Sequence, residues 1–276
     1  MLGKFFGKGK HKPVVSAEPS EPAVRADPPE PAAMPAVGQP PWEGEPEQAA
    51  CDSAVGNLFN TLPARLAVEG RVHAQTCLAA IGAIAGFSAQ RALFEHLKTS
   101  GDQALLKQMR TVKTKSGGEY FFGEPLNRML IPASEAESNQ RLWSLAASGA
   151  VTAGLAFSKL PDLGDMFTHI ATTIGGEREG LPSIGKAHYP HLAGKELLKA
   201  VWPLALACFS GQIPDAPRDY GAAPTRHWPA ISGRVASALI QKMAPALDPR
   251  IALIIVMESA IHASKVKPSV ASAVAA

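Results

Sequence analysis

The chain has 276 residues, of which 46% are hydrophobic, 6% aromatic and 18% charged, and its net charge at pH 7 is +3. So small a net positive charge does not indicate the concentrated basic face that is typical of nucleic-acid-binding proteins. The cysteines Cys51, Cys77 and Cys208 are too few and too scattered for a disulfide framework or a thiolate zinc site. We therefore expect a cytoplasmic protein with no specific nucleic-acid partner and no cofactor.

The composition changes abruptly near residue 50. Residues 1–12 carry four lysines and no acid, whereas residues 13–50 hold ten of the 24 prolines and seven acids against the single Arg25. Proline fixes φ and removes backbone donors, and few large apolar side chains are present to offset the entropy of ordering. We expect residues 1–50 to form a disordered tail, made of a basic tip (1–12) and an acidic Pro/Ala/Glu-rich tether (13–50).

The basic tip mixes apolar side chains with lysines. Phenylalanine rings can insert at a lipid interface while each lysine near an anionic surface contributes about 1 kcal/mol. The tip could therefore attach the chain weakly to the inner face of the membrane, contact nucleic-acid phosphate nonspecifically, engage the acidic tether, or serve only as a solvated terminus. The residues concerned are Leu2, Lys4, Phe5, Phe6, Lys8, Lys10 and Lys12.

The body of the chain, residues 51–266, reads as a single multi-helix domain of the mainly α class, and residues 267–276 as a flexible C-terminus. Apolar residues recur near helical spacing over 64–98, where Gly82 and Gly86 lie four apart and predict close packing of a central helix. The longest uncharged apolar stretches fall short of the ~20 residues that a bilayer requires.

Further helices are predicted from spacing and from their end signals. Asp162 is a good N-cap for a helix over 162–174, and Asp248–Pro249 supplies an N-cap and first-turn pair for a helix over 249–266. The remaining predicted helices cover 135–158, 194–210, which Pro203 should kink, and 234–245.

Residues 109–124 differ from the rest of the body. They contain β-branched residues, an aromatic run and the pair Gly117–Gly118, which can supply the positive φ of a tight turn. This segment predicts a short β-hairpin.

Residues 180–187 (GLPSIGKA) match the spacing G-x-x-x-x-G-K of a phosphate-binding loop. The match has Ala187 where such a loop needs a hydroxyl to bind Mg²⁺, and a helix rather than a strand is expected before it. We interpret the match as accidental.

Two carboxylate–imidazole pairs lie four residues apart on predicted helices, Asp165 with His169 and Glu258 with His262. On facing helices such groups could converge on a metal, although the di-iron bundle signature places Glu and His three apart. The alternative is an ordinary helix-surface pair with no metal role.

The loops 175–194 and 211–232 contain further imidazoles and aromatic rings. They include the sequences HYPH (188–191) and RHW (226–228), which could act as ligands, acid–base groups or partner contacts, or could simply dock rings on the domain. No nucleophile signature accompanies them. The sequence thus favours a non-catalytic protein-interaction or adaptor module with a tethered basic tip. The alternative is a metal-dependent enzyme or metal-binding protein that uses these loops and the two helix pairs, and the oligomeric state stays open.

Overall fold

The computed structural model describes residues 38–213 and 221–272. The basic tip and most of the tether, residues 1–37, lie outside the described residues, as do residues 273–276.

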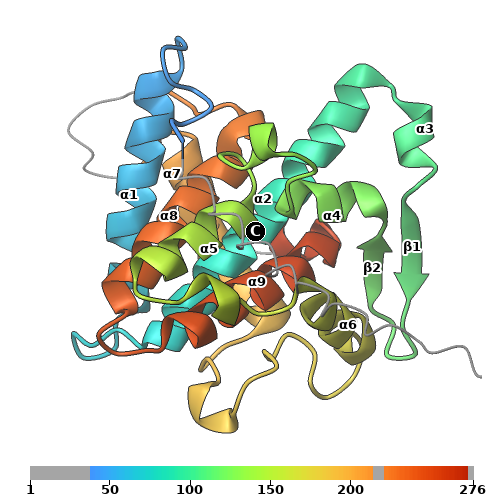
Figure 1. The fold of residues 1–276 in the computed structure, drawn as a ribbon. Helices are drawn as coiled ribbons and strands as arrows, with labels where there is room; N and C mark the ends of the chain where they lie inside the picture. The colour runs from blue at the N-terminus through green and yellow to red at the C-terminus, as the bar shows by residue number, and fades with distance from the viewer. Residues whose placement is uncertain (1–37, 214–220, 273–276) are drawn as a thin grey trace, which may run out of the picture. The chain divides into compact units, whose positions relative to one another are not determined.

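The mainly α class predicted from the sequence is confirmed, with a two-stranded antiparallel sheet as a minor element (Figure 1). Short 3-10 turns connect several of the helices. The α-helices are α1 (Gln48–Leu66), α2 (Ala74–Ser100), α3 (Gln103–Leu106), α4 (Glu124–Leu130), α5 (Leu142–Thr152), α6 (Leu163–Thr173), α7 (Gly194–Phe209), α8 (Trp228–Met243), α9 (Pro249–Lys265) and α10 (Ser269–Ser272).

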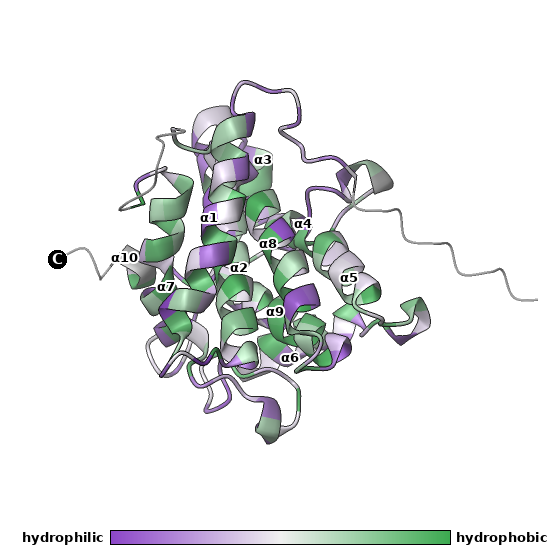
Figure 2. Cartoon of the chain, turned by 90° about the vertical axis from the view of Figure 1, so that its left-hand side faces the viewer, coloured by the Kyte–Doolittle hydropathy of each residue, from purple (hydrophilic) through white to green (hydrophobic). Residues whose placement is uncertain are grey.

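The core is built around the neighbouring helices α2 and α9, which run in the same direction, lie at the centre of the helices in Figure 2 and are coloured largely as hydrophobic. A β-carbon on Gly82 would lie 2.3 Å from the carbonyl oxygen of Val256, and one on Gly86 would lie 2.0 Å from that of Ala260. The two helices can approach this closely only because both positions lack a side chain, which confirms the predicted close packing.

Helix α2 is long and apolar enough to cross a membrane by length and composition. However, 89% of its most apolar window is buried inside the fold. This burial is typical of the core helix of a water-soluble domain.

The predicted hairpin is present. Strand β1 (Arg110–Lys113) pairs antiparallel with β2 (Glu119–Phe122), with Arg110 opposite Phe122 and Lys113 opposite Glu119. The turn between them has Gly117 at φ 83°, as the Gly–Gly pair predicts. Tyr120 is buried and forms an isolated bridge to Val266, which fastens the hairpin to the end of α9.

The folded body begins earlier than the composition break at residue 50 predicts. Trp42 is fully buried, and its indole N–H donates to Asp52 Oδ1 at 2.8 Å. The rings of His227 and Trp42 lie 5.6 Å apart, and the guanidinium of Arg234 lies 5.8 Å from the Trp42 ring. The folded body extends beyond the composition break because one large aromatic side chain can anchor an otherwise proline-rich segment.

At the other end, part of the segment predicted to be a flexible C-terminus packs on the body. Lys267 forms an ion pair with Glu119, and Val270 of α10 contacts the hydrophobic core. Helix α10 lies against α7.

The helix ends agree with the sequence where a capping residue marks them. Asp162 accepts a hydrogen bond from the Asp165 N–H at the start of α6, and Asp248 accepts one from the Arg250 N–H at the start of α9. Elsewhere the bounds differ. The predicted helix over 64–98 is broken by a tight turn in which Glu69 and Gly70 both have positive φ, 51° and 75°.

Three other predicted helices also differ in extent. Helix α5 covers only the middle of 135–158, and α8 begins at Trp228 rather than at 234. Helix α7 continues through Pro203 to Phe209.

Candidate functional site

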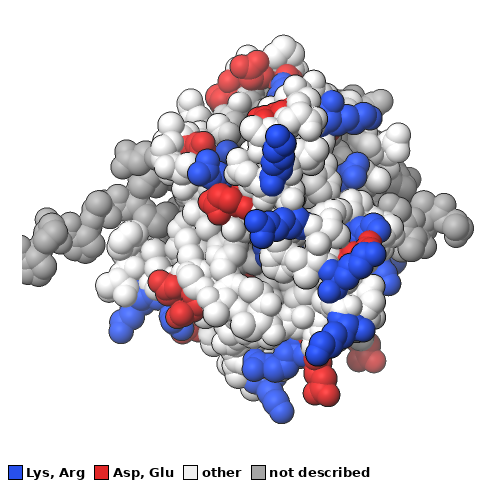
Figure 3. Space-filling view, turned by 90° about the vertical axis from the view of Figure 1, so that its right-hand side faces the viewer, with Lys and Arg blue, Asp and Glu red and all other residues white. Residues whose placement is uncertain are grey.

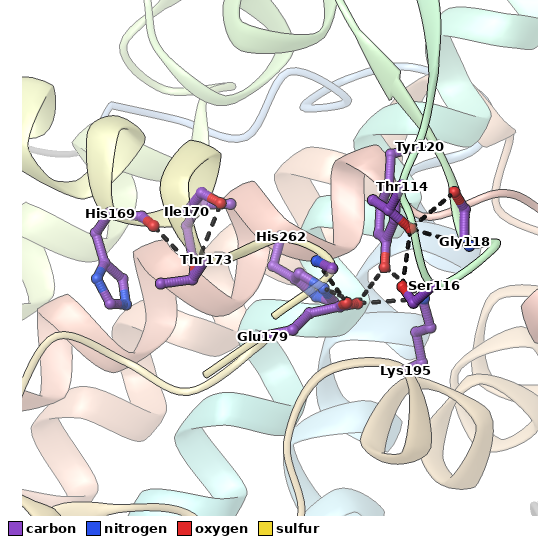
Figure 4. A network of polar contacts seen from close by, with 11 residues as sticks. Thr114, Ser116, Gly118, Tyr120, His169, Ile170, Thr173, Glu179, Lys195 and His262 are labelled. Atoms are coloured by element: carbon purple, nitrogen blue, oxygen red, sulfur yellow. Dashed lines mark hydrogen bonds and ion pairs between the residues drawn. The ribbon is translucent and has the colours of Figure 1, made fainter. Parts of the chain in front are cut away.

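Two glutamates hold the loop between α6 and α7, residues 174–193, to the body. One belongs to the loop and the other to helix α9. The first is Glu179, in the loop itself. Its carboxylate oxygen Oε1 accepts from the Tyr120 hydroxyl at 2.5 Å and from His262 Nε2 at 3.1 Å, and lies 3.2 Å from Lys195 Nζ. Its Oε2 accepts from the Gly175 N–H at 2.9 Å. Figure 4 shows these side chains converging from β2, α7, α9 and the loop.

The charges and hydrogen-bond donors of this cluster favour the ionised form of Glu179. Burial by itself raises the pKa of Glu179, but the hydrogen bonds from His262, Tyr120 and Gly175 outweigh it and hold the pKa well below the usual range. Burial and the neighbouring carboxylate raise the pKa of Tyr120. Because both oxygens of Glu179 are already bonded, the cluster is suited to clamping the loop rather than to proton transfer or metal binding.

The second glutamate, Glu258, lies on α9 and is 1% exposed. Its two oxygens accept from the Ser183 N–H and the Ser183 hydroxyl, each at 2.5 Å. Burial raises the pKa of Glu258, and the bonds from Ser183 and the charges of His169 and Arg178 oppose this only in part. The loop is therefore fastened a second time, four residues beyond Glu179.

The two predicted carboxylate–imidazole pairs do not form within their helices. Asp165 is exposed in the first turn of α6, while His169 bonds the Leu181 carbonyl oxygen through Nε2 at 2.9 Å. His169 Nε2 also lies 3.9 Å from Glu258 Oε2, so the structure joins one member of each pair. His262 is directed to Glu179 instead of to Glu258. The buried partners come from the loop, which helical spacing could not indicate.

In these contacts the imidazole Nε2 atoms have no free electron pair with which to bind a metal. A carbonyl oxygen only accepts, so His169 Nε2 carries its proton, and His262 Nε2 donates to an ionised carboxylate. Within residues 38–213 and 221–272 there is no group of three or more His, Cys, Asp or Glu side chains placed to hold a metal ion.

The phosphate-loop-like segment 180–187 does not have the geometry of a phosphate site. Helix α6, not a strand, precedes it, and the backbone N–H of Ser183 is occupied by Glu258. Both features differ from those of a phosphate-binding loop, which lies between a strand and a helix and leaves its backbone N–H groups free for phosphate.

The aromatic loop residues dock on the body. The Trp228 ring stacks on Phe209 with centroids 4.7 Å apart, and His227 Nε2 lies 3.0 Å from Glu47 Oε1. His191 stacks on His73 with centroids 3.7 Å apart and an interplanar angle of 8°. The imidazole and indole rings of these segments therefore pack on the body.

A groove lies between the end of α1 and α7, and no pattern in the sequence predicts it. Helices α1 and α7 are on the face turned toward the viewer in Figure 2. This α1–α7 groove has a volume of about 640 Å³. Its apolar lining consists mainly of Leu66, Leu192, Pro203 and Leu204, and its charged lining of Arg65 and Lys199.

A smaller hollow of about 260 Å³ adjoins the groove at Leu66 and includes Val68, Val72 and Arg71. Val68 is 69% exposed and Leu192 is 45% exposed, which is unusual for such side chains. No acidic residue lines either hollow among the described residues. The groove and the hollow together make an apolar surface with basic residues at its margin.

The face that carries the hairpin bears charged side chains of both signs. Figure 3 shows the face that carries the hairpin, where Lys and Arg are spread among uncharged and acidic side chains.

The tip residues Leu2, Lys4, Phe5, Phe6, Lys8, Lys10 and Lys12 lie outside the described residues. No family model, curated protein or solved structure matches this chain.

Proposed function

We propose that this chain is a non-catalytic protein-interaction module whose α1–α7 groove binds an acidic, amphipathic segment of a protein partner. The observation that carries the proposal is the groove itself, which combines exposed Leu192 and Val68 with the bases Arg65, Lys199 and Arg71 and has no acidic lining residue. Apolar anchors in a concave site supply affinity, and charges at the margin select the partner and orient it.

The shape of the groove favours a peptide segment over a flat surface. It runs beside α7, where Lys199 and Pro203 lie one turn apart, so that an extended or helical segment can place successive apolar side chains along it. A partner with acidic residues flanking two or three apolar anchors has the complementary chemistry.

The enzyme alternative has less support. The buried carboxylates Glu179 and Glu258 are occupied by groups of the protein, and the imidazoles of His169 and His262 donate to oxygen acceptors. The arrangement supports a structural role for the cluster, that of holding the 174–193 loop.

We also propose a cytoplasmic location and a weak contact of the basic tip with the membrane. Four lysines among Leu2, Phe5 and Phe6 would give a reversible, salt-sensitive attachment to anionic lipid. Sedimentation of the full chain with phosphatidylserine vesicles should decrease when residues 1–12 are removed, and unchanged sedimentation would contradict this part.

The groove is tested by comparing partner capture between matched variants of the full chain. Leu192→Glu places a charge in the groove, whereas Val112→Glu places one at a site of similar exposure (45% against 43%) on the hairpin. A protein captured by the wild type and by Val112→Glu, but not by Leu192→Glu, supports the proposal.

Two further results complete the test. Lys199→Glu should weaken capture at low salt more than at high salt, since the charge contribution is screened. Equal capture by the Leu192→Glu and Val112→Glu variants would overturn the assignment of the groove as the binding surface.

A further inference from the structure

Lys265, the last residue of α9, is a buried cation without an acidic partner. It is 3% exposed, and its Nζ lies 5.0 Å from the ring centroid of Phe122 and 5.7 Å from that of Phe167. Its amine donates to Asn127 Oδ1 over a long 3.4 Å. The ion pairs formed within the described part of the chain do not include Lys265.

Burial therefore acts on this amine with little opposition. It lowers the pKa of Lys265 to about 8. At pH 7.5 roughly a quarter of such an amine is neutral, compared with about 0.1% of an ordinary lysine. A neutral amine carries the free electron pair that a nucleophile needs.

A hollow of about 380 Å³ lies next to this amine, between α4 with the segment that follows it and α6. Asn127 and Phe167 belong both to the lining of the hollow and to the surroundings of Lys265 Nζ. Ile131 and Pro132 provide apolar lining. The amine does not itself line the hollow, but Asn127 and Phe167 are neighbours of both.

The charges that line the hollow cancel. Glu124 and Arg128 form an ion pair with 3.5 Å between Oε1 and Nε, and no other charged side chain lines the hollow among the described residues. An apolar space with balanced charges favours an uncharged ligand over an anion.

From this juxtaposition we propose that Lys265 is the reactive amine of a site for small uncharged aldehydes or ketones, which enter through the hollow between α4 and α6. Asn127, whose side-chain oxygen lies 3.4 Å from Nζ, also lines the hollow and so connects it to the amine. The site lies apart from the α1–α7 groove and does not depend on the function proposed for it.

The step is imine formation. The electron pair of neutral Nζ attacks the carbonyl carbon, and the C=O π pair moves to oxygen, which takes a proton as nitrogen loses one. The resulting carbinolamine then loses water to leave a C=N double bond. One amine and one carbonyl give one imine and one water, so the step needs no oxidant or reductant.

The test is trapping of the imine in the full chain. Butanal and sodium cyanoborohydride at pH 7.5 convert an imine into a stable butylamine that peptide mass spectrometry locates. We expect Lys265 to be butylated at least about tenfold faster than Lys186, an exposed lysine of the 174–193 loop, because far more of its amine is neutral. Labelling of Lys265 no faster than that of Lys186 would overturn the proposal.

A second set of variants tests the route of access. Ala133→Trp fills the hollow without touching Lys265 and should abolish labelling of Lys265 while leaving that of Lys186 unchanged. Ala133→Leu gives a smaller plug if the larger one impairs folding, which circular dichroism would reveal. Rapid labelling of Lys265 in a folded plugged variant would show that the hollow is not the route and would also overturn the proposal.

Discussion

Burial disfavours the charged form of both Lys265 and Glu179, but only Glu179 has neighbours that offset this effect. Lys265 has aromatic rings around its amine and no ion-pair partner within the described residues, so burial disfavours its charge. Glu179 has four donors around its carboxylate, so its charge is retained. In each case the side-chain partners, not burial alone, determine which protonation state the fold prefers.

We expect Lys265→Met to stabilise the body near neutral pH. Between about pH 8 and pH 10.4 the unfolded chain binds more protons than the folded one, so this lysine makes stability rise with pH in that window. Below about pH 8 the buried ammonium lowers the free energy of unfolding by its full amount, about 3 kcal/mol. Urea denaturation of both proteins at pH 7 and pH 10 measures this.

The stabilising effect of Lys265→Met should accordingly be largest at pH 7 and shrink toward pH 10.4. An unchanged difference between wild type and variant across this window would contradict an unpaired buried ammonium.

Glu179→Gln should loosen the 174–193 loop and destabilise the body by about 1–3 kcal/mol. The substitution removes the negative charge that Tyr120, His262 and Lys195 contact. The stability due to the charge is present above the ordinary glutamate pKa, about 4.3, and is lost as the pH falls below it. Amide hydrogen exchange of residues 175–183 measures the loosening.

The matched control is Glu177→Gln, an exposed position two residues earlier in the loop. Equal protection of the loop amides in the two variants would argue against Glu179 as the clamp.

At the scale of elements, the pairing of α2 with α9 depends on positions without side chains. Gly82 and Gly86 were identifiable from their spacing, but the surface that they meet on α9, Val256 and Ala260, was not. The spacing of glycines within one helix indicates which face of that helix lacks large side chains. Only the tertiary structure shows which helix packs against that face.

Gly86→Ala should destabilise the body by more than 2 kcal/mol, because the added carbon would lie 2.0 Å from a backbone carbonyl oxygen that cannot move without its helix. Gly56→Ala, in an exposed turn of α1 with nothing within 4 Å of the added carbon, should instead stabilise by about 0.5–1 kcal/mol. Thermal denaturation of the two variants decides between these opposite signs. A stable Gly86→Ala protein would refute the close approach of α2 and α9.

At the scale of the whole molecule, the described body depends on its first ten residues. Trp42 is buried beside α1, and Glu47 pairs with Arg226 and His227 at the start of α8. Residues 38–47 thus connect the beginnings of two helices that are far apart in the sequence.

A chain that begins at residue 38 should therefore be more stable than one that begins at residue 51. Loss of the buried Trp42 side chain alone costs about 3–5 kcal/mol, to which loss of the Glu47 contacts adds. Chemical denaturation of fragments 38–276 and 51–276 measures the difference. Equal midpoints would mean that the composition break at residue 50 is the true boundary after all.

The sequence by itself determined the helical class, the hairpin and the helix starts at Asp162 and Asp248, because these depend on signals within a few residues. It also indicated His169, Glu258 and His262 as noteworthy, but for a pairing that does not form. Glu179, in a loop with no pattern, gave no signal at all.

Only the tertiary structure decided which groups meet. Glu179 gathers partners that lie up to 83 residues away, and Lys265 becomes unusual only when two aromatic rings from other elements enclose it. Similarly, the α1–α7 groove exists because two helices distant in the sequence leave a space between their side chains. Burial and charge pairing are properties of neighbours in space, and local patterns in a chain of mostly small aliphatic residues carry little information about those neighbours.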